Sequence, residues 1–181
     1  MINEQNKQQV ILIDENNRII GTEDKIKAHR EGKLHRAFSI FIFLQKNDER
    51  HLLLQKRHPK KYHSGDLWSN TCCSHPRPGE EIVAAGERRL YEEMGLKIPL
   101  KEVGKFRYTA QVGHLIENEY DHILVGFATD TTIYFNKKEI NTIRWINIAD
   151  LERELKRHPE IFTPWLDLAL KIALKNLESV L

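Results

Sequence analysis

Side chains able to bind a metal ion or to carry a proton gather in three short stretches of this sequence. The stretch from Asn70 to His75 places a cysteine thiol two residues before a histidine. The other two stretches, one before it and one after it, add imidazole and carboxylate groups, which together suit a divalent transition ion. These residues indicate a metal-assisted proton transfer or a phosphate site, and the candidates are His29, His35, Cys73, His75, Glu117 and Glu119.

The acidic pair Glu117 and Glu119 is separated by one residue on a segment predicted to be extended. Side chains two apart on a strand point to the same face. Both carboxylates can therefore serve one shared ion.

A second cluster lies on a segment predicted to be a helix, from Glu80 to Gly95. Arg88 and Arg89 precede Glu92 and Glu93 by about one turn, so carboxylates for a metal and cations for phosphate oxygens can share a face. The simpler alternative is a solvated helix held by ion pairs between residues three and four apart.

The composition limits the classes of protein. A chain of 181 residues fits one domain, here residues 1–181 with residues 1–9 as a flexible N-terminus. A net charge of +2, from 28 basic and 26 acidic residues, predicts no nucleic-acid partner. The apolar run from Ala37 to Leu44 is too short to cross a bilayer, and the polar start lacks a signal peptide, so we expect a soluble, cytoplasmic protein without a membrane partner. Its two adjacent cysteines favour free thiols.

The elements that must position these residues follow from turn signals and apolar periodicity. A hairpin of strands at 10–13 and 18–20 precedes a helix capped by Thr22 and reaching about His29. Further strands are predicted at 38–44, 51–57, 103–108, 123–129 and 143–146, and a polar loop at 60–65 leads into the stretch 68–73. Helices are predicted at 80–95, 150–158 and 164–178, the last with Thr163 as its cap. This order predicts a mixed sheet with helices on its faces, an α/β sandwich.

The predicted helix also carries a spaced motif. Ser74 is followed after five residues by Glu80 and after seven more by the run from Arg88 to Leu96. This resembles the Nudix box, a loop-helix-loop that holds a divalent metal against a diphosphate. Ser74 stands where the box has glycine, and Arg89 stands where it has the glutamate that helps to load a hydrolytic magnesium. The resemblance implies a Nudix-type α/β/α sandwich.

From Val10 to about Trp165 the chain resembles the type I isopentenyl-diphosphate isomerases. The matching stretches are Leu34 to Ser39, Asn70 to Pro76, Phe106 to Tyr108, Glu117 to Glu119, and Thr163 to Trp165. The resemblance implies conversion of isopentenyl diphosphate to dimethylallyl diphosphate by protonation and deprotonation through a carbocation, in isoprenoid precursor biosynthesis.

The family pattern also implies a role for each matched residue. Glu119, assisted by Tyr108, faces Cys73 across the substrate, with the direction of proton donation left open, and Trp165 offers its ring to the cation. One transition metal, Mn²⁺ or Zn²⁺, is bound by His29, His35, His75, Glu117 and Glu119. A Mg²⁺ ion joins the diphosphate to Glu93 and to the backbone carbonyl of Cys73. The expected diphosphate contacts are Lys25, Arg57, Lys61, with the equally basic Lys60 beside it, and Arg89.

Two other classes of function remain open at this point. A Nudix diphosphohydrolase acting on a nucleotide or another diphosphate would use Glu80, Glu92 and Glu93, although Arg89 argues against it. A non-catalytic diphosphate-binding module would need no facing acid and base. In each case the partner is a small-molecule diphosphate, and the protein is expected to be a monomer or a homodimer.

Overall fold

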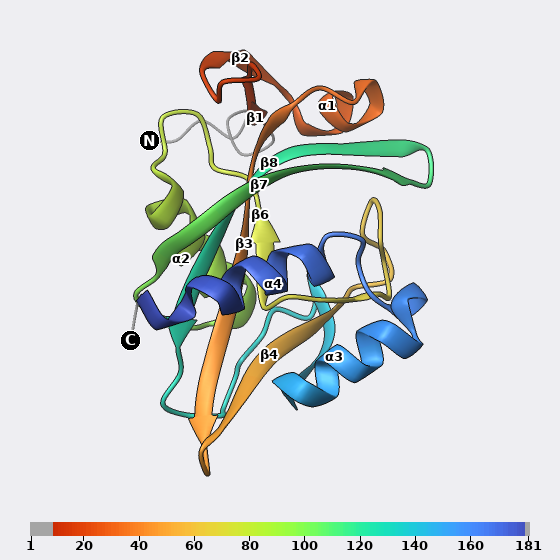
Figure 1. Ribbon diagram of the computed structural model, residues 1–181. Coiled ribbons are helices and arrows are strands. Elements are labelled where there is room, and N and C mark those ends of the chain that lie inside the picture. The colour runs from red at the N-terminus through yellow and green to blue at the C-terminus, as the bar shows by residue number, and fades with distance from the viewer. Residues whose placement is uncertain (1–8, 180–181) are drawn as a thin grey trace.

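A mixed nine-stranded sheet organises residues 9–179, the part of the chain that the computed structural model describes (Figure 1). Four α-helices and two short 3₁₀ turns, η2 and η3, complete that part. The strands are β1 (Gln9–Ile13), β2 (Ile19–Asp24), β3 (His35–Lys46), β4 (Glu49–Arg57), β5 (Trp68–Ser69), β6 (Cys72–Ser74), β7 (Lys101–Val112), β8 (Leu115–Phe127) and β9 (Ile140–Asn147). The helical elements are α1 (Lys25–Glu31), α2 (Ile82–Met94), α3 (Ile148–Arg157), η2 (Pro159–Ile161), α4 (Leu166–Asn176) and η3 (Leu177–Ser179).

Strand β3 lies at the centre and is buried on both faces, which explains its unbroken apolar run. Alternate side chains from Phe38 to Ile42 pack in a cluster with Leu90 of α2. Phe41 and Phe43 point the other way, into a cluster that includes side chains of α4. The helices α2 and α4 therefore cover opposite faces of the sheet, and the predicted α/β/α sandwich is confirmed (Figure 1).

Strand β8 brings the predicted site residues to the centre of the sheet. It pairs in parallel with β3, where Glu119 is the partner of His35, and antiparallel with β7, where Glu119 is the partner of Tyr108. Residues far apart in the sequence are thus neighbours across the ladder. This register places Glu119 between His35 and Tyr108.

The first helix begins later than its sequence predicts. Thr22 lies in β2, where it pairs with Ile11. Asp24 is the cap instead, because its carboxylate accepts a hydrogen bond of 2.9 Å from the backbone N–H of Lys27. The ladder with β1 outcompetes the local capping signal of Thr22. Gln9 begins β1, so the predicted flexible N-terminus is wrong at this residue, and residues 1–8 lie outside the described part.

The last helix also begins later than its sequence predicts. Thr163 does not cap it: its N–H donates to the carbonyl of Trp68 at 2.9 Å, and its hydroxyl lies 3.1 Å from that of Ser69. The helix α4 starts at Leu166. Contact with β5 across the fold therefore engages Thr163 ahead of the helix.

Other boundaries differ where polar residues lie within elements. The stretch 68–73, which has no predicted element, contains β5 and the start of β6, and between them the Asn70 side chain donates to the carbonyls of Ile40 and Cys72 at 3.1 and 2.7 Å. The helix predicted from Glu80 begins at Ile82, after a turn in which Glu80 donates its N–H to the carbonyl of Arg77. No helix between residues 9 and 179 combines the length and apolar character needed to cross a membrane.

Candidate metal centre and active site

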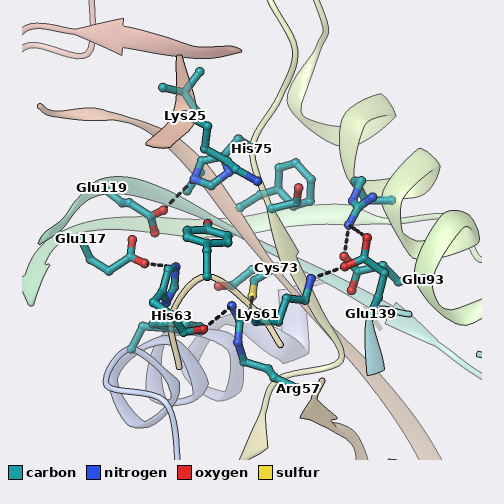
Figure 2. A pocket seen from close by; sticks show the side chains of 18 of the residues that line it. Lys25, Arg57, Lys61, His63, Cys73, His75, Glu93, Glu117, Glu119 and Glu139 are labelled. Carbon is teal, nitrogen blue, oxygen red and sulfur yellow. Dashed lines mark hydrogen bonds and ion pairs between the residues drawn. The ribbon is translucent and has the colours of Figure 1, made fainter. Parts of the chain in front are cut away.

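A cavity of about 250 Å³ opens where β3, β6 and β8 meet α2 and the loop after β4 (Figure 2). This volume suits a small molecule. Eleven of the thirteen residues predicted for the site line it: Lys25, Arg57, Lys61, Cys73, His75, Arg89, Glu93, Tyr108, Glu117, Glu119 and Trp165. The other two, His29 and His35, are fully buried and belong to the histidine cluster beside it.

The three predicted histidine ligands come from three elements and converge through their Nε2 atoms. His29 lies on α1, His35 begins β3, and His75 follows β6. The Nδ1 atoms of His29 and His35 lie 2.6 and 2.7 Å from the carbonyls of Lys25 and Lys33. Because a carbonyl only accepts, each Nδ1 carries a proton, so in the neutral imidazole the free lone pair is on Nε2. That is the tautomer a metal requires.

Two carboxylates complete this cluster. The Oε1 atom of Glu119 lies 2.9 Å from Nε2 of His75 and 3.5 Å from Nε2 of His35, and these two nitrogens are 3.2 Å apart. The Oε2 atom of Glu117 lies 3.5 Å from Nε2 of His29. Donor atoms bound to one ion at about 2.0–2.2 Å have separations of this order. The cluster has the geometry of a metal centre.

Two features of the buried groups test whether a metal fits. The Nε2 atom of His29 is buried without a hydrogen-bond partner, which is costly unless something else binds its lone pair. Burial lowers the pKa of His75 to about 4, so its imidazole is neutral at pH 7, as a ligand must be. These five residues therefore fit a divalent transition ion.

The carboxylate of Glu119 is also bonded to the predicted aromatic partner. The Tyr108 hydroxyl donates to Oε2 of Glu119 at 2.6 Å. Burial, and then the charge of Glu119, raises the pKa of Tyr108 well above its ordinary value. Burial would raise the pKa of Glu119 too, but the neighbouring His35 and His75 imidazoles hold that pKa well below its ordinary value. A neutral phenol thus donates to an ionised carboxylate.

The two adjacent cysteines point to opposite sides of β6, as alternation along a strand requires. Cys72 is fully buried in the core cluster against α2, whereas Cys73 lines the cavity. Burial raises the pKa of Cys73 to about 12, although Arg57, which donates to its sulfur at 3.5 Å, opposes the rise. Cys73 is therefore a thiol at neutral pH.

Trp165 and Arg57 close the cavity beside this thiol. The indole Nε1–H of Trp165 donates to Oδ1 of Asn70 at 3.0 Å, which fixes the ring with only 4% of the residue exposed. The Arg57 guanidinium lies 5.6 Å from the centre of that ring. The Trp165 ring therefore forms an aromatic wall of the cavity, and the Arg57 cation lies against this ring.

Four predicted cations, Lys25, Arg57, Lys61 and Arg89, line the cavity (Figure 2). Burial, and then the charges of Lys61 and Arg89, lowers the pKa of Lys25, as expected where cations crowd together. Lys60 is exposed and does not line the cavity, so Lys61 is the better placed of the two. Such a cluster is suited to a multiply charged anion.

The acids of the α2 motif differ in their availability. Glu93 is buried and lines the cavity, where it pairs with Arg89. Glu80 is bonded by Arg88 at 2.6 Å, and Glu92 by Arg89 at 2.8 Å. Of these acids, only Glu93 lines the cavity. Glu93 is therefore the acid of this motif that could bind a metal ion beside an anion in the cavity.

Tyr62, His63 and Glu139 are among the further residues that line the cavity and that the sequence did not single out. The Nε2 atom of His63 lies 2.7 Å from Oε1 of Glu117, and Glu139 pairs with Lys61 and, at 3.7 Å, with Arg89. Their spacing matches no motif. The one sequence signal for His63 is its position two residues after the predicted diphosphate contact Lys61.

Comparison with known proteins gives consistent matches. The model of the NUDIX domain matches residues 33–166. An "Isopentenyl-diphosphate Delta-isomerase" from Photobacterium profundum is 43% identical over 176 residues, which cover 96% of this chain and 98% of that protein. The "Isopentenyl-diphosphate Delta-isomerase 1" from Aromatoleum aromaticum is 49% identical over 160 residues, 88% of each chain.

Solved structures match in fold. The crystal structure of DR0079 from Deinococcus radiodurans has a TM-score of 0.72 at 17% identity, covering 91% of this chain and 96% of that one. The NUDIX domain of Shewanella oneidensis NrtR, solved with ADP ribose, has a TM-score of 0.61 at 11% identity and covers 80% of this chain and 87% of that one. At these identities the likeness establishes the fold alone.

Proposed function

Because the chain belongs to the isopentenyl-diphosphate Delta-isomerase family of Nudix-domain proteins, we propose that it converts isopentenyl diphosphate to dimethylallyl diphosphate in isoprenoid precursor biosynthesis. The observation that carries this proposal is the shared cavity of Cys73 and the Tyr108–Glu119 pair. Moving the double bond requires an acid and a base at neighbouring carbons, and these groups can supply both.

The protonation states of the two groups favour this reaction. In the free protein Cys73 is a thiol and Glu119 is a carboxylate, so one of the pair holds a transferable proton and the other can accept one. The Tyr108 hydroxyl links Glu119 to the cavity through its hydrogen bond. Trp165 stabilises the carbocation with its π face and helps to exclude the water that would trap it.

The cations bind and orient the diphosphate. Lys25, Arg57, Lys61 and Arg89 give four positive charges to a group that carries about three negative charges at pH 7. In this assignment His29, His35, His75, Glu117 and Glu119 hold Mn²⁺ or Zn²⁺, while Glu93 and the Cys73 carbonyl hold Mg²⁺. The bound ions would adjust the acidity of Glu119 and offset the charge of the diphosphate.

Hydrolysis of the diphosphate is disfavoured by the ion pairs of α2. Arg89 occupies the position where the Nudix box has an acid, and its guanidinium pairs with Glu92 and Glu93. Glu80 and Glu92 are then paired with arginines and do not line the cavity, so Glu93 is the one acid of this motif left beside a metal there. This is the specific reason to prefer isomerisation.

The decisive test incubates the metal-loaded protein with isopentenyl diphosphate in deuterated water. We expect dimethylallyl diphosphate with deuterium at the methyl carbon derived from the alkene terminus, and no orthophosphate. The matched Glu119→Gln variant should give no labelled product, because an amide cannot take part in the proton transfer. Mass spectrometry and a phosphate assay measure both products.

Other outcomes separate the alternatives. Orthophosphate without labelled carbon would favour the diphosphohydrolase and move the catalytic role to Glu92 and Glu93. Binding of the diphosphate without either product would favour the binding module. A single domain, a monomer or homodimer, and a cytoplasmic location remain part of this proposal, and limited proteolysis, light scattering and cell fractionation would test them.

A further inference from the structure

His63 is a buried residue of the loop between β4 and β5 that no predicted role includes, and 8% of it is exposed. We propose that His63 is a positioning residue that holds the Glu117 carboxylate with a single oxygen turned toward the three-histidine cluster. This inference rests on the metal centre of the proposed function. It adds a residue to that centre which acts through Glu117.

The two oxygens of Glu117 have different partners. Oε1 lies 2.7 Å from Nε2 of His63 (Figure 2). Oε2 lies 3.5 Å from Nε2 of His29 and 3.5 Å from the Tyr108 hydroxyl. Oε2 therefore lies toward His29 of the three-histidine cluster, while Oε1 is engaged by His63. His63 occupies the lone pair that would otherwise let the carboxylate turn.

Hydrogen-bond roles fix the direction of this contact. An ionised carboxylate can only accept, so Nε2 of His63 is the donor. In a neutral imidazole Nδ1 then accepts, and its partner at 3.1 Å is the Ser64 hydroxyl, which must donate. The chain of donors runs from Ser64 through His63 to Glu117.

The ring of His63 is held from several sides. It lies edge-on to Tyr62 at 4.3 Å and to Trp165 at 6.1 Å between ring centres, and it stacks on His29 at 5.8 Å. Its position is therefore set by packing before any metal binds. Preorganised partners of this kind orient metal ligands, and their loss typically weakens metal affinity by about 10- to 100-fold.

The backbone of the same segment has a separate task. Arg57 donates from Nη2 to the carbonyl of His63 at 3.3 Å and from Nε to that of Ser64 at 3.2 Å. A change in the His63 side chain leaves both carbonyls in place. Loss of the imidazole should thus affect the metal and spare the diphosphate contact of Arg57.

The test measures Zn²⁺ affinity of the full-length protein, stripped of metal, in competition with a chromophoric chelator. We expect His63→Leu to weaken Zn²⁺ binding by about 10- to 100-fold. His63→Gln, whose amide can donate from a similar reach, should stay within about threefold of the parent. Adding His63→Leu to Glu117→Gln should cause no further loss, because the imidazole acts through that carboxylate.

His122 provides a matched control. It is similarly buried, with 6% exposed, and its Nδ1 lies 2.9 Å from Oε1 of Glu102, outside the histidine cluster. His122→Leu should leave Zn²⁺ affinity unchanged, and circular dichroism checks that each variant folds. Measured affinity for isopentenyl diphosphate in the His63→Leu protein should match that of the parent.

Two results would overturn the inference while leaving the metal centre intact. One is parent-like Zn²⁺ affinity in the folded His63→Leu protein. The other is a loss in His63→Gln as large as in His63→Leu, which would make the imidazole nitrogen a direct ligand. Failure of the parent itself to bind Zn²⁺ would instead overturn the metal centre on which the proposal rests.

Discussion

Adjacent residues of one short strand, Cys72 and Cys73, have opposite environments and should have opposite sensitivities to substitution. Cys72 is fully buried among apolar side chains, and Cys73 lines the cavity next to Arg57. Since the strand alternates its faces, neither residue can replace the other. The pair is an internal comparison between a packing role and a chemical role.

Replacing Cys73 by Ala should lower isomerase turnover by about 10²- to 10⁴-fold, the usual effect of losing a general acid or base. The thiol is uncharged, and its contact with the cationic cluster is one 3.5 Å hydrogen bond from Arg57, so diphosphate affinity should remain near that of the parent. Steady-state kinetics and calorimetric titration measure the two quantities. Cys72→Ala should change turnover little, and a Cys73→Ala protein within tenfold of the parent would contradict the assignment.

The Cys73 thiol should also react slowly with alkylating agents at neutral pH. Burial raises its pKa from 9.0 to about 12, so its thiolate fraction at any lower pH is smaller than that of an ordinary cysteine. In the Cys72→Ala protein we expect the rate of reaction with iodoacetamide to rise about tenfold per pH unit from pH 8 to 10. Mass spectrometry follows the reaction, and a plateau near pH 9 would show an unshifted thiol.

The site was predictable residue by residue only where a motif carried the information. Cys73, Glu119 and Tyr108 were found because they stand in recognisable stretches, and each faces the cavity or the metal cluster. His63 stands in a polar loop without such a pattern. Its role depends on a bend that brings the loop against β8, and spacing along the chain does not encode that approach.

At the scale of elements, the end of α2 controls the position of Glu93. Gly95 ends the helix in the left-handed conformation, with φ of 68°, and the N–H of Asn136 donates to the carbonyl of Glu93 at 2.7 Å. An added Cβ on Gly95 would lie 2.8 Å from the carbonyl oxygen of Tyr134. The helix end is thus fitted to the loop before β9.

Gly95→Ala should destabilise the protein more than Gly113→Ala. Both glycines have a positive φ, 68° and 65°, but a Cβ on Gly113 would meet nothing within 4 Å. The left-handed conformation costs each alanine roughly 1–2 kcal/mol. The backbone contact at Gly95 should add about 1–3 kcal/mol, as overpacking does. Urea unfolding measures both, and equal losses would show that the loop yields without cost.

Element types were more predictable than element lengths. The apolar run of β3 and the αL glycine that ends α2 gave clear local signals, and the structure confirms both. Strands β7 and β8 extend well beyond the predicted 103–108 and 123–129. The first half of β8 carries polar residues such as Glu117 and Glu119, which line the cavity, so apolar periodicity gives no clear start for this strand.

At the scale of the whole molecule, the candidate metal centre joins α1, β3, the turn after β6, and β8. An ion held there would tie α1 and the turn after β6 to β8 and to the start of β3. Because it binds only the folded protein, it should stabilise the fold as a whole.

Loading with Zn²⁺ at 100 times its dissociation constant should raise the free energy of unfolding by about 2.7 kcal/mol. Urea titrations of the stripped and loaded protein measure the difference. The His75→Ala, Glu117→Gln double variant should retain little metal by elemental analysis and should show no such gain. A metal content equal to that of the parent would exclude these residues as the ligands.

The parallel pairing of β3 with β8 also sets an order of events in time. His35 and Glu119 are register partners separated by most of the sheet's other strands in the sequence, so their meeting requires a long loop to close. Long-range parallel pairs form slowly in folding, after local hairpins such as β7–β8. The ion can be captured only once this pair has closed. The time course of Zn²⁺ uptake during refolding would therefore report when the β3–β8 pair forms.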